Sequence, residues 1–212
     1  MGAADGPGLG WSQPSATEVV LASASPRRHA LLAGAGVRFR IEPADVDETI
    51  RAELGAGAAA EDLALRKARA VAERRGPGDG PAVILGSDTL VVLGEDGAAD
   101  RRFLEKAPDA AAAGEMLRAL SGSRHRVITG IAVVWTEGGA VKSDHETTWV
   151  TMREISAAEI DAYVASGEWR GKAGAYAIQE TADRFVLGLE GGGFDNVVGL
   201  PVQRTLELLS GS

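Results

Sequence analysis

The sequence contains no cysteine. Disulfide bonds, thiolate catalysis and cysteine-ligated zinc are therefore excluded. Histidine is scarce as well, since His29, His125 and His145 are far apart in the chain and match no metal-ligand motif. These absences exclude thiol chemistry and the histidine-based metal motifs that can be read from spacing.

Long apolar runs are also missing. No stretch approaches the roughly 20 residues that a membrane-spanning helix needs, so no membrane partner is expected. The N-terminal segment has neither a basic start nor an apolar core, as a secretory signal would. We therefore expect residues 1–17 to be a disordered leader, residues 18–210 to form a single domain, and the protein to be cytoplasmic.

Positive charge is in deficit, with 22 Lys and Arg residues against 30 Asp and Glu residues and a formal net charge of -8. A nucleic-acid-binding protein needs a basic face, so nucleic acid is not an expected partner. A small anionic ligand remains compatible with this balance, because a few local cations can make a positive pocket on an acidic protein. Arg and Lys residues do gather at loop positions.

Alternating strand and helix patterns predict an α/β domain. Strands are expected over residues 18–22, 37–43, 81–93, 125–136, 140–153 and 184–190. Helices are expected from Pro26 to Gly34 or Gly36, over residues 60–75, 108–120 and 156–164, and from Pro201 onward. Two local signals support specific helix starts: Ser25 before Pro26, and the capping box that begins at Ser156.

Asp88 stands out because it lies within the apolar strand VILGSDTLVV. An unpaired buried carboxylate costs several kcal/mol, so such a residue is kept when it is paired, hydrogen-bonded or bound to a metal. Gly86, two residues earlier, would allow a bulge or the close approach of a ligand. From this strand alone, a structural ion pair and a functional carboxylate are about equally supported.

The first strand-to-helix turn has the composition of an anion site. Residues 23–28 (SASPRR) combine the hydroxyls of Ser23 and Ser25, a helix N-terminus and the guanidiniums of Arg27 and Arg28. Helix N-termini favour anions, and arginine matches phosphate oxygens bidentately. Taken in isolation, the turn is better explained as a capped helix carrying solvated arginines, since most arginines are exposed.

Three lysines and an acidic loop extend this set. Lys67 lies in a predicted helix, and Lys106 and Lys172 lie in loops; each taken alone would be a solvated surface residue. Glu48 ends the acidic loop 45–48 and is a candidate to share a divalent cation with Asp88. Magnesium is the usual metal where oxygen ligands meet phosphates.

Ordered motifs along the chain resemble the Maf family. They span about Val19 to Leu209 and read, in order, LASASPRRHALLAGAGVRF, DVDET, LGSDTLVV, LEKAPD, MLRALSG, HRVITGIAVV, KAGAYAIQ and NVVGLPV. The resemblance implies an elongated mixed sheet with flanking helices and two lobes around a central cleft, akin to the inosine triphosphate pyrophosphatases. It further implies a nucleoside triphosphate pyrophosphatase that releases pyrophosphate and a nucleoside monophosphate, uses Mg²⁺ or Mn²⁺ and forms a homodimer.

The resemblance also assigns roles to residues of this chain. Asp88 matches the proposed general base, and Arg27, Thr89 and Gln179 match positions linked to substrate choice. Other positions that line the family's cleft correspond to Ser23, Arg28, Glu48, Lys67, Lys106 and Lys172. Taken with the residue chemistry, the expected catalytic set is Asp88, Arg27, Lys67 and Lys106. Substrate binding is expected at Ser23, Ser25, Arg28, Thr89, Lys172 and Gln179, and metal binding at Glu48 and Asp88.

The SPRR, SDT and YAIQ segments resemble the branch that hydrolyses dTTP and UTP, so the resemblance implies dTTP, UTP or modified pyrimidine nucleotides as substrates. Three features depart from that branch: Glu180 in place of the common Gly, Ala107 in place of Pro, and extra glycine in 190–196. The departures leave 7-methyl-GTP or another non-standard nucleotide as an alternative substrate. A nucleotide-binding regulator of cell division without turnover is a further alternative, because the family was named for an effect on septum formation.

Overall fold

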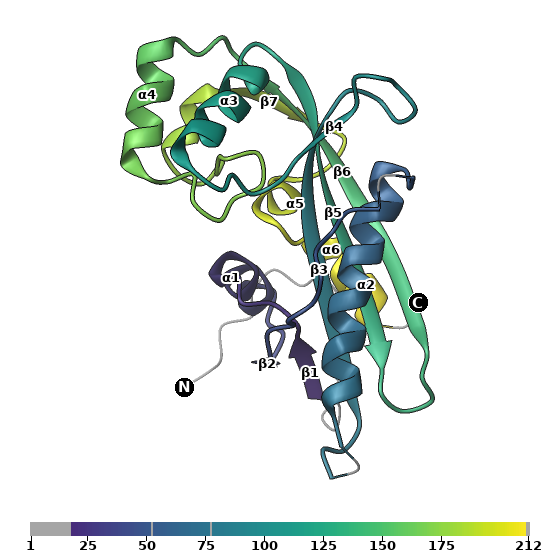
Figure 1. Ribbon diagram of the computed structural model, residues 1–212. Helices are drawn as coiled ribbons and strands as arrows, with labels where there is room; N and C mark the ends of the chain where they lie inside the picture. The colour runs from purple at the N-terminus through teal and green to yellow at the C-terminus, as the bar shows by residue number, and fades with distance from the viewer. Residues whose placement is uncertain (1–17, 52, 77, 211–212) are drawn as a thin grey trace, which may run out of the picture.

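A mixed sheet runs through the middle of the molecule and carries helices on both faces (Figure 1). The computed structural model describes residues 18–51, 53–76 and 78–210. The sheet has seven strands in the order β2-β1-β3-β5-β6-β7, with β4 also paired to β3. The predicted α/β class is confirmed, whereas the predicted leader, residues 1–17, lies outside the described residues.

The strands are β1 (Glu18–Leu21), β2 (Phe39–Ile41), β3 (Ala82–Leu93), β4 (Arg102–Leu104), β5 (Arg124–Trp135), β6 (Val141–Met152) and β7 (Val186–Glu190). The helices are α1 (Pro26–Gly34), α2 (Ala56–Arg74), α3 (Ala110–Leu120), α4 (Ala157–Ser166), the 3₁₀ helix η1 (Thr181–Phe185), α5 (Phe194–Val198) and α6 (Val202–Leu209). β1 runs parallel to β2 and β3, and the other pairings are antiparallel.

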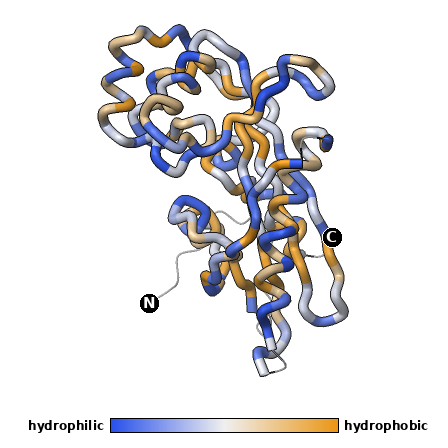
Figure 2. Tube along the Cα trace, in the orientation of Figure 1, coloured by the Kyte–Doolittle hydropathy of each residue, from blue (hydrophilic) through white to orange (hydrophobic). Residues whose placement is uncertain are grey.

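The two faces of the sheet are buried by different helices, because successive side chains of a strand point to opposite sides. Ile84 of β3 packs with Ala68 and Val71 of α2. Leu85 of β3 belongs instead to a cluster on the other face that includes leucines of α1 and α6. Figure 2 shows hydrophobic residues gathered along the central strands. This double covering explains why β3 is apolar at almost every position.

Two strand glycines let α2 lie against the sheet. A Cβ on Gly86 would lie 2.1 Å from the carbonyl oxygen of Ala64, and one on Gly130 would lie 2.2 Å from that of Ala60. Both distances are far below van der Waals contact, so only glycine fits. The hypothesis that Gly86 admits a ligand or a bulge is therefore wrong, since the helix backbone occupies that space.

A third apolar cluster fills the end of the molecule that holds α3 and α4. Leu117 and Leu120 of α3 pack there with Tyr163 of α4 and Phe185 of η1. α4 begins with the predicted capping box, in which the Ser156 and Glu159 side chains each bond the other residue's backbone N–H. The molecule is thus elongated, with α3 and α4 at one end of the sheet and α1, β1 and β2 at the other (Figure 1).

Several boundaries differ from the sequence predictions. Helix α2 begins at Ala56 rather than residue 60, because the carboxylate of Asp96, from a distant loop, accepts a hydrogen bond from the Ala56 N–H. β2 is shorter than predicted, and residues 184 and 185 belong to η1. The short elements β4 and α5 were not predicted, since so few residues show no periodicity.

Candidate functional site

The site lies where β3 has no neighbour along one edge. β1 pairs with β3 as far as Leu85, and β4 pairs with it from Val91 onward. Within the described part of the chain no strand pairs with that edge between these two residues. Consequently Asp88, on the face of α2, and Thr89, on the opposite face, can both reach one pocket.

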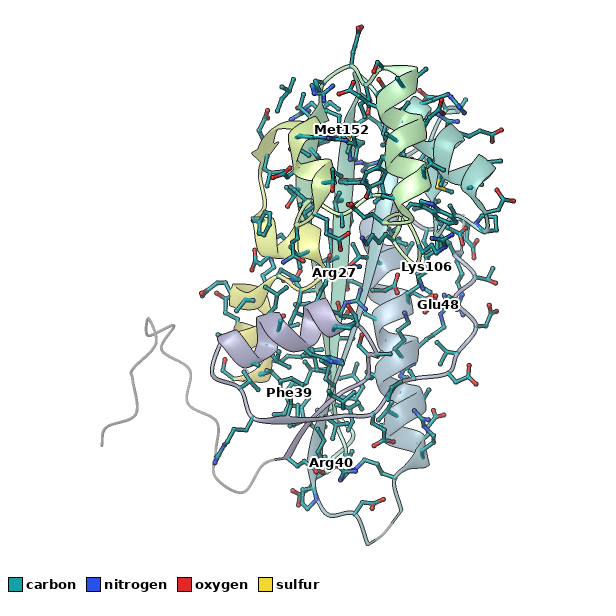
Figure 3. The ribbon with its side chains drawn as sticks, turned by 90° about the vertical axis from the view of Figure 1, so that its left-hand side faces the viewer. Arg27, Phe39, Arg40, Glu48, Lys106 and Met152 are labelled. Carbon is teal, nitrogen blue, oxygen red and sulfur yellow. The ribbon has the colours of Figure 1, made fainter. Side chains whose placement is uncertain are left out.

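The pocket has a volume of about 570 Å³ and is lined from both ends of the molecule. All the predicted site residues line it: Ser23, Ser25, Arg27, Arg28, Glu48, Lys67, Asp88, Thr89, Lys106, Lys172 and Gln179. Figure 3 shows Arg27, Glu48 and Lys106 near the middle of the elongated molecule. The fold therefore brings together side chains that are up to 156 positions apart, from Ser23 to Gln179.

The first wall of the pocket is the turn at the start of α1. Ser25 is the N-cap, and its hydroxyl accepts from the Arg28 backbone N–H at 3.5 Å. The Ser23 hydroxyl accepts from the Ser25 N–H at 3.2 Å. Pro26 occupies the first helical turn, where its missing N–H leaves no donor unpaired. The predicted cap is confirmed, and the positive end of the helix dipole lies at the pocket.

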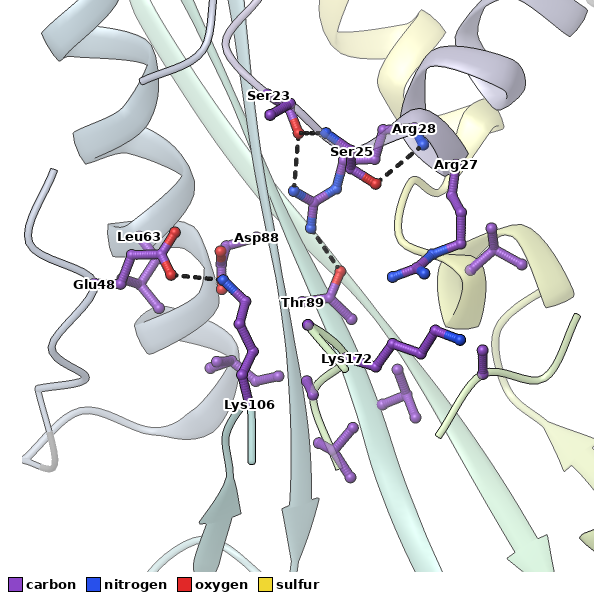
Figure 4. A pocket seen from close by; sticks show the side chains of 18 of the residues that line it. Ser23, Ser25, Arg27, Arg28, Glu48, Leu63, Asp88, Thr89, Lys106 and Lys172 are labelled. Carbon is purple, nitrogen blue, oxygen red and sulfur yellow. Dashed lines mark hydrogen bonds and ion pairs between the residues drawn. The ribbon is translucent and has the colours of Figure 1, made fainter. Parts of the chain in front are cut away.

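Arg28 is held by three different partners, of which Ser23 and Thr89 are shown in Figure 4. Its Nε donates to the Gly199 carbonyl at 2.8 Å, and its two terminal nitrogens donate to Thr89 at 3.0 Å and Ser23 at 3.3 Å. Burial lowers the pKa of the Arg28 guanidinium, while the nearby Asp88 opposes that change. Arginine nevertheless stays charged at neutral pH. Arg28 is thus a fixed cation. Arg27, the residue before it, extends into the pocket (Figure 4).

Lys67 lies between the two carboxylates of the site. Its Nζ is 2.5 Å from Asp88 Oδ1 and 2.6 Å from Glu48 Oε1. Lys106 approaches the second oxygen of Glu48 at 2.8 Å. The Lys67 side chain is only 8% exposed and that of Asp88 13%, so this lysine is not the solvated surface residue that its type suggests.

Charge around Glu48 keeps it ionised. Partial burial acts to raise the pKa of its carboxyl group, but hydrogen bonds from Lys106 and Lys67 outweigh that effect and bring the pKa to about 2. Glu48 is therefore an anion at neutral pH. Four charged groups, two acidic and two basic, meet at this corner of the pocket.

Lys172 closes the other side of the pocket. Its side chain is 8% exposed and forms an ion pair with Glu180. Lys106 and Lys172 are brought near each other because Lys106 forms an isolated β-bridge with Ala173. Glu180, the residue that departs from the family pattern, therefore neutralises one of the pocket's lysines.

The direction of the hydrogen bonds at Thr89 follows from proton counting. Thr129 donates its hydroxyl proton to the Asn196 carbonyl at 2.8 Å, and a carbonyl can only accept. The 3.0 Å bond between the Thr89 and Thr129 hydroxyls must then be donated by Thr89. With its proton used in this way, Thr89 presents only acceptor capacity to Arg28 and to the pocket.

Residues 18–212 match the family model described as Maf-like protein. The chain belongs to the Maf family. This confirms the resemblance read from the motifs, and the match covers all the residues that line the pocket.

Relatives of known name agree with this membership. A dTTP/UTP pyrophosphatase of Moorella thermoacetica is 47% identical over 194 residues, which cover 92% of this chain and 94% of the relative. One from Rhodospirillum rubrum is 48% identical over 209 residues, covering 98% and 93%. Among solved structures, a nucleoside-triphosphatase / dITP/XTP pyrophosphatase from Mycobacterium abscessus matches with 22% identity and a TM-score of 0.40, over 65% of this Maf chain and 75% of that one.

The donor set of the pocket fits a divalent cation. Glu48 and Asp88 both direct a carboxylate oxygen at one point, since a single ammonium contacts both. Carboxylate oxygens are the ligands that Mg²⁺ and Mn²⁺ prefer. Glu48 and Asp88 would hold such a metal in place of the Lys67 ammonium, and the metal would supply positive charge to bound phosphates.

A second group of metal-ligating side chains lies outside the pocket. Glu61 of α2 and Asp144 and His145 of β6 have ligand atoms within 4.8 Å of one another. Their atoms already have partners: Glu61 bonds Ser143 and His145, and Asp144 bonds Arg204. None of the three lines the pocket. Sequence spacing did not reveal this group, because α2 and β6 are far apart in the chain.

Sequence reasoning missed Tyr176, which also lines the pocket. Its hydroxyl shares a 2.9 Å hydrogen bond with Nε2 of His125, a wholly buried residue of β5. Burial lowers the pKa of His125 to about 4 and raises that of Tyr176 above its usual range. Both groups are therefore neutral at physiological pH, and they support the pocket wall without charge.

Stability should fall in mild acid because of His125. Its pKa is about 6.5 in the unfolded chain and about 4 in the folded one, so the unfolded state binds more protons between these values. The contribution of neutral His125 to the free energy of unfolding is complete above about pH 6.5. It declines by up to about 1.4 kcal/mol per pH unit as the pH falls to about 4. Urea unfolding at several pH values measures it, and His125→Gln should show a shallower decline over that window. Equal slopes for the two proteins would contradict the assignment.

No helix in the described part of this Maf protein is both long and apolar enough to cross a membrane.

Proposed function

We propose that this protein is a nucleoside triphosphate pyrophosphatase that prefers dTTP and UTP. The observation that carries the proposal is the pairing, in one pocket, of an anion-binding helix turn with a carboxylate held among lysines. Relatives that are 43–48% identical bear the name dTTP/UTP pyrophosphatase, which supports both the reaction and the base.

In the proposed binding mode, the triphosphate lies along the turn from Ser23 to Arg28. Arg27 and the lysines of the pocket neutralise its charge, and backbone N–H groups at the start of α1 meet phosphate oxygens. The triphosphate would compete with Glu180 for Lys172 and with Glu48 for Lys106, so both lysines can turn toward phosphate.

The proposed chemistry is attack of water on the α-phosphorus. Asp88 takes the proton of the water as the new P–O bond forms, and the bond from the α-phosphorus to the bridging oxygen breaks. Pyrophosphate leaves with the bonding electrons, and Lys67, Lys106 and Arg27 stabilise its charge. A divalent cation bound by Glu48 and Asp88 would supply further charge neutralisation on the phosphates.

Base preference follows from the donors and acceptors that the pocket can offer. Thr89 can only accept, so it matches the N3–H of uracil or thymine and not the bare N3 of cytosine. Gln179 lines the same pocket, and its amide can both donate and accept. We assign Thr89 and Gln179 to recognition of the base edge.

A panel of nucleotides tests the proposal. The protein is incubated with MgCl₂ and UTP, dTTP, CTP, GTP, ITP or 7-methyl-GTP, and pyrophosphate release is measured. We expect kcat/KM for UTP and dTTP to exceed that for CTP by about tenfold or more, since one mismatched hydrogen bond is worth roughly that factor. Preference for 7-methyl-GTP would overturn the pyrimidine assignment. Tight nucleotide binding without pyrophosphate release would favour the regulatory alternative instead.

Four further properties are proposed: a requirement for Mg²⁺ or Mn²⁺, a homodimer, a cytoplasmic location and a role connected with septum formation. Removal of metal by EDTA, followed by addition of each cation, tests the first. Light scattering coupled to gel filtration tests the second.

A further inference from the structure

A belt of buried polar groups crosses the sheet on the face opposite α2. It consists of Thr89 on β3, Thr129 on β5, Thr148 on β6 and Asn196 on α5. Thr89 and Thr129 are directly opposite each other in the antiparallel pairing. Thr129, Thr148 and Asn196 are all wholly buried. These groups separate the apolar cluster beneath α1 and α6 from the one beneath α3 and α4.

Thr129 is the centre of this belt. It accepts the hydroxyl proton of Thr89 at 3.0 Å and donates its own proton to the Asn196 carbonyl at 2.8 Å. The Asn196 amide in turn donates to the Val127 carbonyl at 3.1 Å and to Thr148 at 2.8 Å. One hydroxyl on β5 therefore joins β3 to α5.

The two elements that Thr129 joins, β3 and the segment at α5, both provide acceptors for Arg28. Thr89 accepts from one terminal nitrogen of its guanidinium at 3.0 Å, and Gly199, which directly follows α5, accepts from its Nε at 2.8 Å. Gly199 has φ of +128° and approaches closely, since a Cβ there would be 3.3 Å from the Thr89 hydroxyl. Thr129 therefore contacts one acceptor, Thr89, directly, and holds the helix that precedes the other, Gly199, whose carbonyl also accepts from the Ser87 hydroxyl at 3.2 Å.

We propose that Thr129 and Asn196 are positioning residues for Arg28, acting through Thr89 and through α5. This inference rests on the proposed function, in which the triphosphate lies along the turn from Ser23 to Arg28 and Arg28 is one of the cations that line its pocket. Neither residue touches the pocket, and both act by fixing the two acceptors that orient the guanidinium.

An apolar side chain at position 129 would pack equally well in the core around β5. Thr129 is the one hydroxyl in the segment VITGIAVV, and its neighbours Ile128 and Ile131 are buried and apolar. A hydroxyl in such surroundings is costly unless both its donor and its acceptor are used, as they are here. The hydrogen bonds of the Thr129 hydroxyl to Thr89 and Asn196 therefore explain why a hydroxyl stands at this position.

Three substitutions test the proposal. Thr129→Val removes the hydroxyl at nearly constant volume, and Thr129→Ser restores it. Thr205→Val is the matched control, because Thr205 is another wholly buried threonine and its hydroxyl donates locally, to the carbonyl of Pro201, the N-cap of α6. For Thr129→Val we expect KM for UTP to rise about tenfold while kcat changes less than about threefold, as lost ground-state binding predicts. Thr129→Ser and Thr205→Val should keep KM within about twofold.

A second readout does not depend on turnover. The Arg28 Nε–H signal, assigned by NMR with Arg28→Lys, should exchange with solvent about tenfold faster in Thr129→Val and unchanged in Thr129→Ser and Thr205→Val. If Thr129→Val matches Thr205→Val in both KM and exchange rate, the residue is merely structural and the inference is wrong. Should the wild-type protein release no pyrophosphate from any triphosphate, the proposed function fails, and the exchange rate alone decides the inference.

Discussion

Replacing Asp88 by Asn is expected to lower pyrophosphate release from UTP by about 10³-fold, the typical worth of a positioned base. Asn has nearly the same shape as Asp but cannot take the proton of the attacking water. The fold should survive, because the Lys67 ammonium keeps its contact with Glu48 at 2.6 Å. A melting temperature within a few degrees of wild type, measured beside the kinetics, would confirm that chemistry and not folding was lost.

Asp144→Asn is the matched control for this experiment. Asp144 is also a strand carboxylate in an ion pair, with Arg204 at 2.6 Å, but it lies outside the pocket. Its replacement should leave kcat within about twofold. If Asp144→Asn were inactive and Asp88→Asn active, the assignment of Asp88 would be wrong. The active site would then be assigned to the group formed by Glu61, Asp144 and His145.

Replacing Gly130 by Ala is expected to destabilise the protein by about 3 kcal/mol, at the upper end of the cost of overpacking a core. The new methyl group would lie 2.2 Å from the backbone of Ala60, so α2 would have to move away from β5. The displacement would also separate Lys67 from Asp88, because Gly130 is directly opposite Asp88 in the sheet. Urea unfolding measures the free energy, and pyrophosphate release should fall together with it.

Gly34→Ala controls for the change of residue type. Gly34 lies in α1, and a Cβ there would meet nothing within 4 Å. The substitution should be neutral or stabilise by up to roughly 1 kcal/mol, since alanine is the better helix former. If Gly130→Ala were as stable as Gly34→Ala, α2 would not be packed against the sheet at the distance described.

The sequence was informative wherever a signal is local. The N-cap Ser25 with Pro26, and the capping box of α4, depend on residues within a few positions of one another, and both are present. The long strands β3, β5 and β6 were likewise predicted to within a few residues. Such elements follow from short-range sterics and hydrogen bonding, which neighbouring residues largely determine.

Elements whose limits depend on distant residues were predicted less well. The start of α2 is set by Asp96, forty positions away, which accepts from the Ala56 N–H. β4 exists because residues 102–104 pair with the part of the β3 edge, from Val91 to Leu93, that β1 does not reach. The role of Gly86 was misjudged for the same reason, since a strand glycine signals close approach without saying what approaches.

The sequence by itself determined which chemical groups are available. They are hydroxyls and arginines at a helix start, an aspartate within an apolar strand, and several lysines, whereas cysteine and clustered histidine are missing. Only the tertiary structure decided how these groups are paired. It places Lys67 between Glu48 and Asp88 and joins Arg28 to Thr129 through Thr89. The physical reason is that a buried charge or hydroxyl is stable only with a partner, and the partners come from strands and helices remote in the chain.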